Sequence, residues 1–345
     1  MKKNLILSLI ILLSGSILIL EGCKKDSNPT LELENPDLSG VMMTLSAISY
    51  IADSFPASTI KDSIVKLLGD KSLATGGKWM LDWGPGVSIG NENMIYVAKN
   101  TVGDSSSYAV VIRGTNIHSI GDIIEDFDVF KLVEFTYGMP GDSVAKGAMD
   151  GLESLRDVQD PAKNTTLVEY LNSVTSSKEI PLFITGHSLG GGLAPLVTYW
   201  LLSHAQLKDK FVFETYAFAG PGMVNKSFKV NFLNSLPANA FHMQVNSLDV
   251  IPYGYANLPG ILSKNIPVHV PLLYKVFISL AQDTLDARGI VYYDIVVADT
   301  IGNIPITNQY NDINPSDTIR WFDHWLGVEH SHNNYLKLLG VNPVN

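Results

Sequence analysis

The stretch "FITGHSLGGGLAP" (residues 183–195) sets one serine, Ser188, among four glycines at the point where an apolar run gives way to small residues. The run before it, "IPLFITG", has the composition of a buried strand, and residues 191–202 have that of a helix. A tight turn between a strand and a helix would make side chains two positions before and after the serine collide, so glycine is needed at both. The stretch therefore predicts a serine hydroxyl presented above a sheet, at the N-terminus of a helix.

A lone serine hydroxyl is a weak nucleophile, so it needs a basic side chain and an acid that orients this base. For a serine on such a turn, an acid and then a histidine are expected later in the chain. Asp249 lies in "QVNSLDVIP" (residues 244–252), where a strand-like apolar run ends in a loop, and it is the predicted acid. His187 is the direct neighbour of Ser188 on the turn. Its side chain should point elsewhere, and we predict a packing role for it.

Four histidines follow Asp249: His269, His324, His330 and His332. The first lies between prolines in "IPVHVP" and comes early, and the second lies beside tryptophan in "RWFDHWLG", so we expect neither to be the base. The last two lie in "EHSHNNYLKLL" (residues 329–339), ahead of a predicted final helix that Ser331 or Asn333 could cap. A catalytic base should lie on a loop end before that helix, which favours His330, with His332 as the alternative.

The negative charge that forms on the substrate oxygen needs hydrogen-bond donors. One predicted donor is the backbone N–H of Leu189, the residue after the serine, at the positive end of the helix. The other is expected in a loop after an earlier strand, and "VVIRGTNIHS" (residues 110–119) supplies Thr115 after Gly114. A threonine can offer both its N–H and its hydroxyl, and such a donor contributes about 3–4 kcal/mol in the transition state.

The rest of the chain alternates strand-like and helical segments. Two helices are expected within residues 41–68, interrupted at Pro56, and neighbouring strands at "MIYVAK" and "YAVVIRGT". Helical spacing recurs over residues 148–175 and 272–285, and the further strands are "FVFETYAFAG" and "FHMQVN". A β-rich stretch, "GIVYYDIVVAD" (residues 289–299), is expected to belong to an insertion or an edge hairpin. This alternation predicts an α/β fold with a mostly parallel central sheet and helices on both faces.

The N-terminus differs from the rest of the chain. Lys2 and Lys3 precede a largely apolar run of 16 residues (5–20), which is short for a bilayer-spanning helix and typical of a secretory signal. Cys23, the only cysteine, follows "LEG" and resembles the cleavage site of bacterial lipoproteins, in which the cysteine is lipidated. We therefore expect a signal peptide over 1–22, a polar tether over 23–40 and an enzyme domain over 41–345, anchored in the cell envelope. An uncleaved anchor or a chance cysteine is the alternative.

Composition limits the possible partners. The 345 residues are 46% hydrophobic and carry a formal net charge of −10, with no cluster of lysine and arginine beyond the first 25 residues. An acidic surface repels phosphate backbones, so nucleic-acid binding is not expected.

Four segments in order resemble the class 3 lipase family, the α/β-hydrolase group that contains fungal triacylglycerol lipases, feruloyl esterases and phospholipases. They are "VVIRGT", "ITGHSLGGGLA", "FAGPGMVNKSF" and "NSLDVIP", and the resemblance spans roughly residues 75–340. It implies an α/β-hydrolase fold, Ser188 as nucleophile, Asp249 as acid and Thr115 with Leu189 at the oxyanion. The bacterial and plant members commonly place the histidine five residues before a tyrosine, as His330 stands before Tyr335, whereas the fungal spacing of three favours His332.

The same resemblance exposes three departures and one further element. The chain has Ala145 and Ala148 where the family often has histidine and phenylalanine, and Gly222 where arginine is common. The spacing of 81 residues between the predicted acid and His330 is long and suggests an insertion within 260–320. Residues 116–135 occupy the position of the family's lid, with isoleucines and Phe127 at helical spacing. A lid of this kind covers the site in water and opens on an apolar interface; an ordinary packed helix is the alternative.

These observations predict a serine carboxylester hydrolase, foremost a lipase acting on acylglycerol-type esters, with no metal or cofactor implied. A phospholipase or a feruloyl- or acetyl-type polysaccharide esterase of the same fold is the first alternative. An envelope lipoprotein that binds acyl or glycan ligands without turnover is the second.

Overall fold

The computed structural model describes residues 38–53, 57–88, 93–114, 129–176, 178–264, 269–302 and 318–345. The predicted signal peptide, Cys23, Thr115 and the lid segment up to residue 128 lie outside the described residues. Within the described ranges, no helix combines the length and the hydropathy that a bilayer-spanning segment requires.

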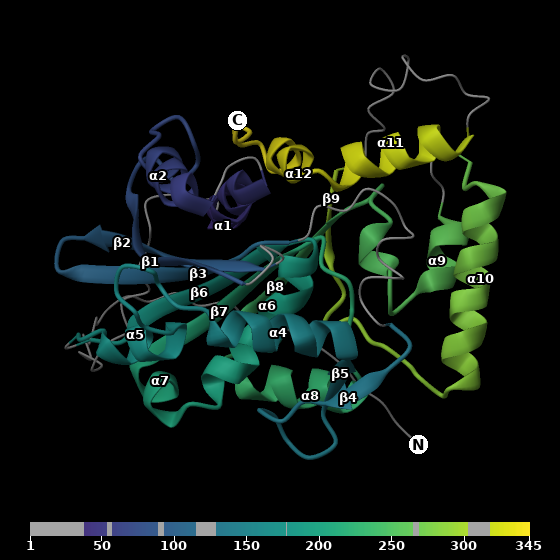
Figure 1. Cartoon of the computed structure of the whole chain (residues 1–345), viewed down its shortest axis with the longest axis horizontal. Helices are drawn as coiled ribbons and strands as arrows, with labels where there is room; N and C mark the ends of the chain where they lie inside the picture. The colour runs from purple at the N-terminus through teal and green to yellow at the C-terminus, as the bar shows by residue number, and fades with distance from the viewer. Residues whose placement is uncertain are drawn as a thin grey trace, which may run out of the picture. The chain divides into compact units, whose positions relative to one another are not determined.

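A seven-stranded sheet forms the centre of the fold, in the order β1-β2-β3-β6-β7-β8-β9 (Figure 1). The strands are β1 (Trp79–Val87), β2 (Met94–Val102), β3 (Ser105–Ile112), β6 (Ile180–His187), β7 (Phe211–Phe218), β8 (Phe241–Asn246) and β9 (Asp299–Ile301). Pairing is parallel from β3 to β9, and β1 and β2 add an antiparallel edge. The short strands β4 (Leu132–Glu134) and β5 (Ser143–Ala145) form a separate antiparallel pair.

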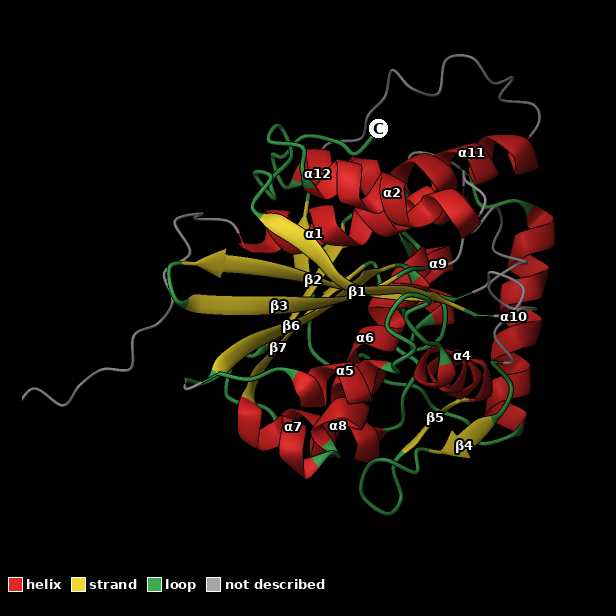
Figure 2. Ribbon diagram, turned by 60° about the vertical axis from the view of Figure 1, so that its left-hand side comes forward, coloured by secondary structure: helices red, strands yellow, loops and turns green. Residues whose placement is uncertain are grey.

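Helices cover both faces of this sheet (Figure 2). On one face lie α1 (Leu38–Ile48), α2 (Ala57–Leu68) and α12 (His332–Leu338). On the other lie α4 (Lys146–Asp157), α5 (Leu167–Ser173), α6 (Leu189–Leu202), α7 (Ala205–Lys210) and α8 (Lys226–Ser235). The helices α9 (Leu258–Ser263), α10 (Leu272–Ala287) and α11 (Thr318–His330) stand at one side. The predicted α/β architecture, a mostly parallel sheet between helices, is confirmed.

The sheet is buried because its inner strands are apolar on both faces. In β3, every residue from Ser107 to Ile112 is buried, and in β6 all but Pro181 are buried. Such continuous apolar runs are expected for parallel strands covered by helices on both sides. The sheet therefore gives a rigid base for the turns at its carboxyl ends, where β6 and β8 lead to Ser188 and Asp249.

The structure differs from the local sequence analysis at three places. The chain has an unpredicted edge strand, β1, which contains Gly84, Pro85 and Gly86; proline and glycine are tolerated at an edge and hide the strand in the sequence. Residues 289–299 form no continuous strand, because only β9 and an isolated bridge between Val224 and Tyr293 pair there. His330 is the last residue of α11 rather than part of a loop.

Candidate active site

Ser188 occupies the turn between β6 and α6 with a strained backbone, φ 60° and ψ −129°. The flanking glycines make this turn possible. A Cβ atom added to Gly186 would lie 2.4 Å from the backbone of Gly190, and one added to Gly190 would lie 2.4 Å from the carbonyl oxygen of Ile112. Real Cβ atoms do not approach backbone atoms so closely, so the turn excludes any side chain at either position.

Three of the predicted site residues lie in one hydrogen-bonded row. The imidazole of His330 is 2.7 Å from the Ser188 hydroxyl through Nε2 and 2.7 Å from Oδ2 of Asp249 through Nδ1. Because a carboxylate only accepts, Nδ1 carries the proton and Nε2 presents its lone pair to the serine. All three side chains are buried, and Asp249 is 1% exposed. In this row, His330 lies where a base can accept the proton of the Ser188 hydroxyl.

Asp249 is held by further donors. The hydroxyl of Tyr335 donates to Oδ2 over 2.8 Å, and the N–H of Ile251 donates to Oδ1 over 2.9 Å. The same tyrosine oxygen accepts from the N–H of Asn246 at 2.9 Å. Burial, and then the charge of Asp249, raises the pKa of Tyr335 well above its ordinary value, so the hydroxyl stays protonated as a donor. The acid is thereby fixed in one orientation toward His330.

A second cluster of hydrogen bonds connects the end of α11, which carries His330, to the end of β8, which leads to Asp249. The amide of Asn246 donates to the Glu329 carboxylate over 2.8 Å and to its carbonyl over 2.9 Å. The amide of Asn334 donates to the same carboxylate oxygen over 3.2 Å. Glu329 directly precedes His330 and is 2% exposed, while Asn246 ends β8 three residues before Asp249. These bonds therefore restrain the end of α11 against the strand that leads to the acid.

The two other histidines near the site have different surroundings. The Nδ1 atom of His187 shares a 2.8 Å hydrogen bond with the Tyr50 hydroxyl, and the ring is buried 4.9 Å from that of His330. His332 stacks on Tyr50, with ring centroids 4.7 Å apart. Burial lowers the pKa of His332 to about 4 and that of His187 well below its ordinary value, with the neighbouring histidines adding to both effects. The structure thus brings His330, and not His332, to the serine.

Of the two predicted oxyanion donors, one is described. Leu189 is the first residue of α6, so its N–H has no acceptor within the helix and lies directly after the serine. Thr115 lies outside the described residues, but the preceding Gly114 packs against the turn. A Cβ atom at Gly114 would lie 3.0 Å from the Cβ of Ser188 and 2.4 Å from the carbonyl oxygen of His187. The segment that leads to Thr115 therefore passes beside the serine.

The small residues that depart from the family pattern, Gly222, Ala145 and Ala148, all lie in closely packed surroundings. A Cβ atom at Gly222 would lie 2.5 Å from Oδ1 of Asp294 and 2.8 Å from the carbonyl oxygen of Tyr293. Residues 293–294 thus fill the space in which a larger side chain would stand. Ala145 and Ala148 are both fully buried in the core, where histidine and phenylalanine would need additional volume.

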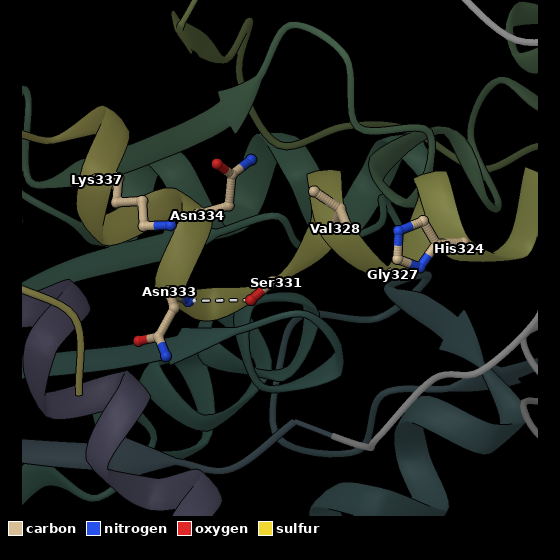
Figure 3. A pocket seen from close by; sticks show the side chains of 7 residues that line it. All are labelled: His324, Gly327, Val328, Ser331, Asn333, Asn334 and Lys337. Carbon is tan, nitrogen blue, oxygen red and sulfur yellow. Dashed lines mark hydrogen bonds between the residues drawn. The ribbon is translucent and has the colours of Figure 1, made fainter. Parts of the chain in front are cut away.

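Two of the cavities among the described residues lie apart from the Ser188–His330–Asp249 row. One of about 300 Å³ runs between α11 and α12 (Figure 3) and is lined by His324, Gly327, Val328, Ser331, Asn333, Asn334 and Lys337. His324, which we did not expect to be the base, is exposed there. The other, of about 650 Å³, lies beside β8 between α8, residues 252–257 and residues 291–300. Neither is lined by a residue of the row.

Sequence reasoning missed the supporting residues Tyr50, Asn246 and Glu329, and used Tyr335 only for its spacing from His330. No local pattern marks these roles, because each contact joins segments far apart in the chain. Tyr335, for example, is 86 residues from the carboxylate to which it donates. The one available signal was that Glu329 directly precedes the predicted base, His330, in the sequence.

Comparisons with known proteins agree with this architecture. Residues 109–257 match the family model described as lipase (class 3), and no curated protein sequence matches the chain. The crystal structure of M37 lipase is similar, with a TM-score of 0.73, 24% identity and coverage of 88% of this chain and 92% of that chain. The alignment with the native Rhizomucor miehei lipase propeptide complex (TM-score 0.45, 21% identity) covers 62% of this chain and 61% of that chain. A triacylglycerol lipase from Penicillium expansum (TM-score 0.44, 18% identity) covers 63% and 73%. The fold, together with the match of residues 109–257 to the class 3 lipase model, makes this chain a carboxylic ester hydrolase of the α/β-hydrolase fold.

Proposed function

We propose that the chain is a serine lipase that hydrolyses acylglycerol-type esters through an acyl-enzyme, with Ser188, His330 and Asp249 as the catalytic triad. The observation that carries this proposal is the row of two 2.7 Å contacts from the serine hydroxyl through His330 to Asp249. The strained backbone of Ser188 supports it, because strain at a single non-glycine residue is retained where it presents a functional group.

In the first half-reaction, Ser188 Oγ attacks the ester carbonyl while His330 Nε2 takes the hydroxyl proton. The resulting oxyanion accepts hydrogen bonds from the N–H of Leu189 and from Thr115, and the N-terminus of α6 adds its positive dipole end. The C–O bond to the alcohol then breaks, and His330 returns the proton to the departing alkoxide. The products are the free alcohol and an acyl group esterified to Ser188.

In the second half-reaction, water replaces the alcohol. His330 Nε2 takes a proton from the water as its oxygen attacks the acyl carbonyl, and the same donors hold the oxyanion. Collapse breaks the bond to Ser188, which recovers its proton from His330, and the carboxylic acid leaves. Asp249 stays ionised throughout and stabilises the imidazolium that forms in each step.

The first experiment is covalent labelling followed by a substrate panel. A fluorophosphonate should modify the purified chain at Ser188 and should leave the Ser188→Ala variant unlabelled. The panel compares nitrophenyl esters of increasing chain length, emulsified triglyceride, phospholipid, and feruloylated or acetylated polysaccharide. Preferred hydrolysis of triglyceride supports the lipase proposal, whereas preference for phospholipid or polysaccharide esters assigns the same triad to another substrate. An absence of labelling and turnover would leave only a ligand-binding role.

We further propose that Cys23 is acylated and anchors the mature chain in the cell envelope. The support lies in the sequence, in which a basic start and a short apolar run precede the only cysteine. The polar residues between Cys23 and the start of α1 at Leu38 would then separate the anchor from the enzyme domain.

A further inference from the structure

The helix α10 (Leu272–Ala287) has an apolar surface on two sides. One side packs into the protein through Tyr274, Ile278, Ala281 and Leu285, all buried. The other is solvent-exposed and carries Leu272, Leu273, Val276, Phe277 and Leu280, which we call the α10 face. Leu272 is 77% exposed and Leu280 57%. An amphipathic helix of a soluble protein normally turns polar side chains to water, so this second apolar side requires an explanation.

The charges on α10 are divided along its length. Between Leu272 and Gln282 the only charged residue is Lys275, whereas the last turns contain Asp283 and Asp286. The N-terminal half of the exposed side of α10 is therefore apolar except for Lys275, and the two aspartates lie near the C-terminal end of the helix. A lysine in such a place can extend its ammonium to a headgroup region while its methylene chain lies in apolar surroundings.

The α10 face is fixed to the helix that carries the proposed base. The hydroxyl of Tyr274 donates to Asp323 on α11 over 2.7 Å, and its ring lies 5.5 Å from that of Phe322. The helix α11 ends at His330, and α10 forms the outer edge of the molecule beside it (Figures 1 and 2). On the other side, α10 packs against α9, which follows the loop after Asp249.

The size of the α10 face favours a lipid surface over a second protein. Five exposed side chains present a few hundred Å² of apolar surface, which is the range of a functional patch on a monomer. A stable protein interface buries about 800 Å² on each partner. An amphipathic helix can instead lie in the plane of a lipid surface with its apolar side only about 5–10 Å deep, and needs no matching partner.

We infer that the α10 face is a docking surface for a lipid–water interface, which holds the enzyme against the aggregate that contains its substrate. The inference rests on the proposed lipase function for its biological meaning, although the docking itself needs no catalysis. Leu272, Leu273, Val276, Phe277 and Leu280 enter the acyl boundary, and Lys275 stays at the headgroups. Since α10 is tied to α11, docking also fixes the orientation of the site toward the lipid.

A fluorophore on the α10 face tests this directly. In a Cys23→Ser background, Ser279→Cys introduces the only thiol, at an exposed position among the apolar residues, and it is labelled with the environment-sensitive dye NBD. A second protein carries the label through Asp286→Cys, near the acidic end of the same helix. On addition of vesicles of phosphatidylcholine and phosphatidylglycerol, the label at 279 should shift to the blue and brighten severalfold, while the label at 286 should change little. Because the readout is local, binding through the N-terminal segment cannot imitate it.

Matched variants complete the experiment. Leu272→Ser with Leu280→Ser should abolish the response at position 279 and lower the rate on emulsified triglyceride at least tenfold. The rate on a soluble nitrophenyl ester should stay the same. Met80→Ser with Val102→Ser removes two apolar side chains of similar exposure, 59% and 57%, from the antiparallel strands β1 and β2, and should change none of these readouts.

The outcomes separate this inference from the proposed function. No response at 279 in a protein that hydrolyses the soluble ester overturns the docking surface and leaves the lipase proposal standing. Insertion by a protein without any esterase activity supports the surface and contradicts the lipase proposal. Concentration-dependent dimerisation that Leu272→Ser with Leu280→Ser removes, without insertion into vesicles, would assign the face to a second copy of the chain and overturn the inference.

Discussion

Tyr335 donates its hydroxyl proton to Oδ2 of Asp249, the same carboxylate oxygen that lies 2.7 Å from Nδ1 of His330. The two donors come from consecutive helices, because His330 is the last residue of α11 and Tyr335 lies in α12. One carboxylate oxygen therefore orients the imidazole and is itself oriented by the tyrosine. This relationship leads to the first prediction.

Tyr335→Phe should lower kcat on a soluble ester by about 10- to 100-fold, because a hydrogen bond to a charged group contributes about 1.5–3 kcal/mol. The tyrosine is buried and acts through Asp249, so KM should change little. The variant should also be less stable, since the N–H of Asn246 loses its acceptor. Steady-state kinetics and denaturant unfolding measure the two effects separately.

Tyr199→Phe is the matched control, because Tyr199 is a buried tyrosine that donates to another carboxylate, that of Asp142. It should lose stability and keep kcat. If both variants lose kcat in proportion to stability, Tyr335 has only a structural role.

Ser188→Ala should reduce ester hydrolysis by about 10⁶-fold, as expected when the members of a triad act as a unit. The change removes one hydroxyl, and alanine on this turn meets the same backbone strain as serine, so the circular dichroism spectrum and the melting temperature should stay close to those of the parent. Rates are measured on a nitrophenyl ester with the parent at matched concentration. Residual activity within tenfold of the parent would exclude the serine mechanism.

The sequence was sufficient for the parts of the fold that local patterns encode. The strand before Ser188, the helix after it and the tight turn between them all follow from a few neighbouring residues, and the structure contains them. The strand β1 could not be predicted from local sequence, because Gly84, Pro85 and Gly86 are residues that normally interrupt a strand. They are tolerated here because β1 lies at the edge of the sheet.

The opposite error occurred at residues 289–299. Their β-branched and aromatic composition suggested an insertion or an edge hairpin, but such composition reports burial as well as strand pairing. Tyr292 and Ile295 are indeed buried, but Val291 is 56% exposed and Val297 96% exposed. Most of the segment pairs with no strand.

For the site, the sequence supplied Ser188, Asp249 and His330 as candidates, and the structure brings these three together. It could not supply the residues that hold them. Asn246, Glu329 and Tyr335 act through long-range hydrogen bonds that depend on how α11, α12 and β8 meet.

Stability should fall as the pH is lowered from about 6.5 to about 4. Burial lowers the pKa of His332 to about 4 in the folded protein, while the unfolded chain titrates near the ordinary value of about 6.5. Between these limits the unfolded state binds the extra proton, so the free energy of unfolding decreases with falling pH by about 3 kcal/mol from this residue. Buried His187 shifts in the same direction and steepens the loss.

Urea unfolding at pH 8 and at pH 4.5 measures this effect. His332→Phe, which can retain the stacking on Tyr50, should flatten the dependence, whereas His324→Gln, at an exposed position, should leave it unchanged. An equal slope in His332→Phe and the parent would show that this histidine does not couple to stability.

Cys23→Ser should move the protein from the membrane to the soluble fraction, or arrest signal processing, and leave the esterase activity of the domain intact. Each acyl CH₂ buried in a bilayer contributes about 0.8 kcal/mol, and more than one chain is needed for stable anchoring. Fractionation and metabolic labelling with a fatty acid analogue test this. Unchanged fractionation together with no acyl label on the parent would exclude the lipoprotein proposal.

The choice of base is tested by substituting His330 and His332 singly. His330→Ala removes the group that lies 2.7 Å from the Ser188 hydroxyl, so hydrolysis of a soluble ester should fall by a factor similar to that of Ser188→Ala. His332→Ala removes a ring that stacks on Tyr50 and faces His187, so it should keep at least a tenth of the parent rate and lose some stability. Both variants are assayed at pH 8 with the melting temperature measured in parallel, which separates lost chemistry from lost folding. An inactive, folded His332→Ala protein beside an active His330→Ala protein would contradict the proposed triad and make His332 the base.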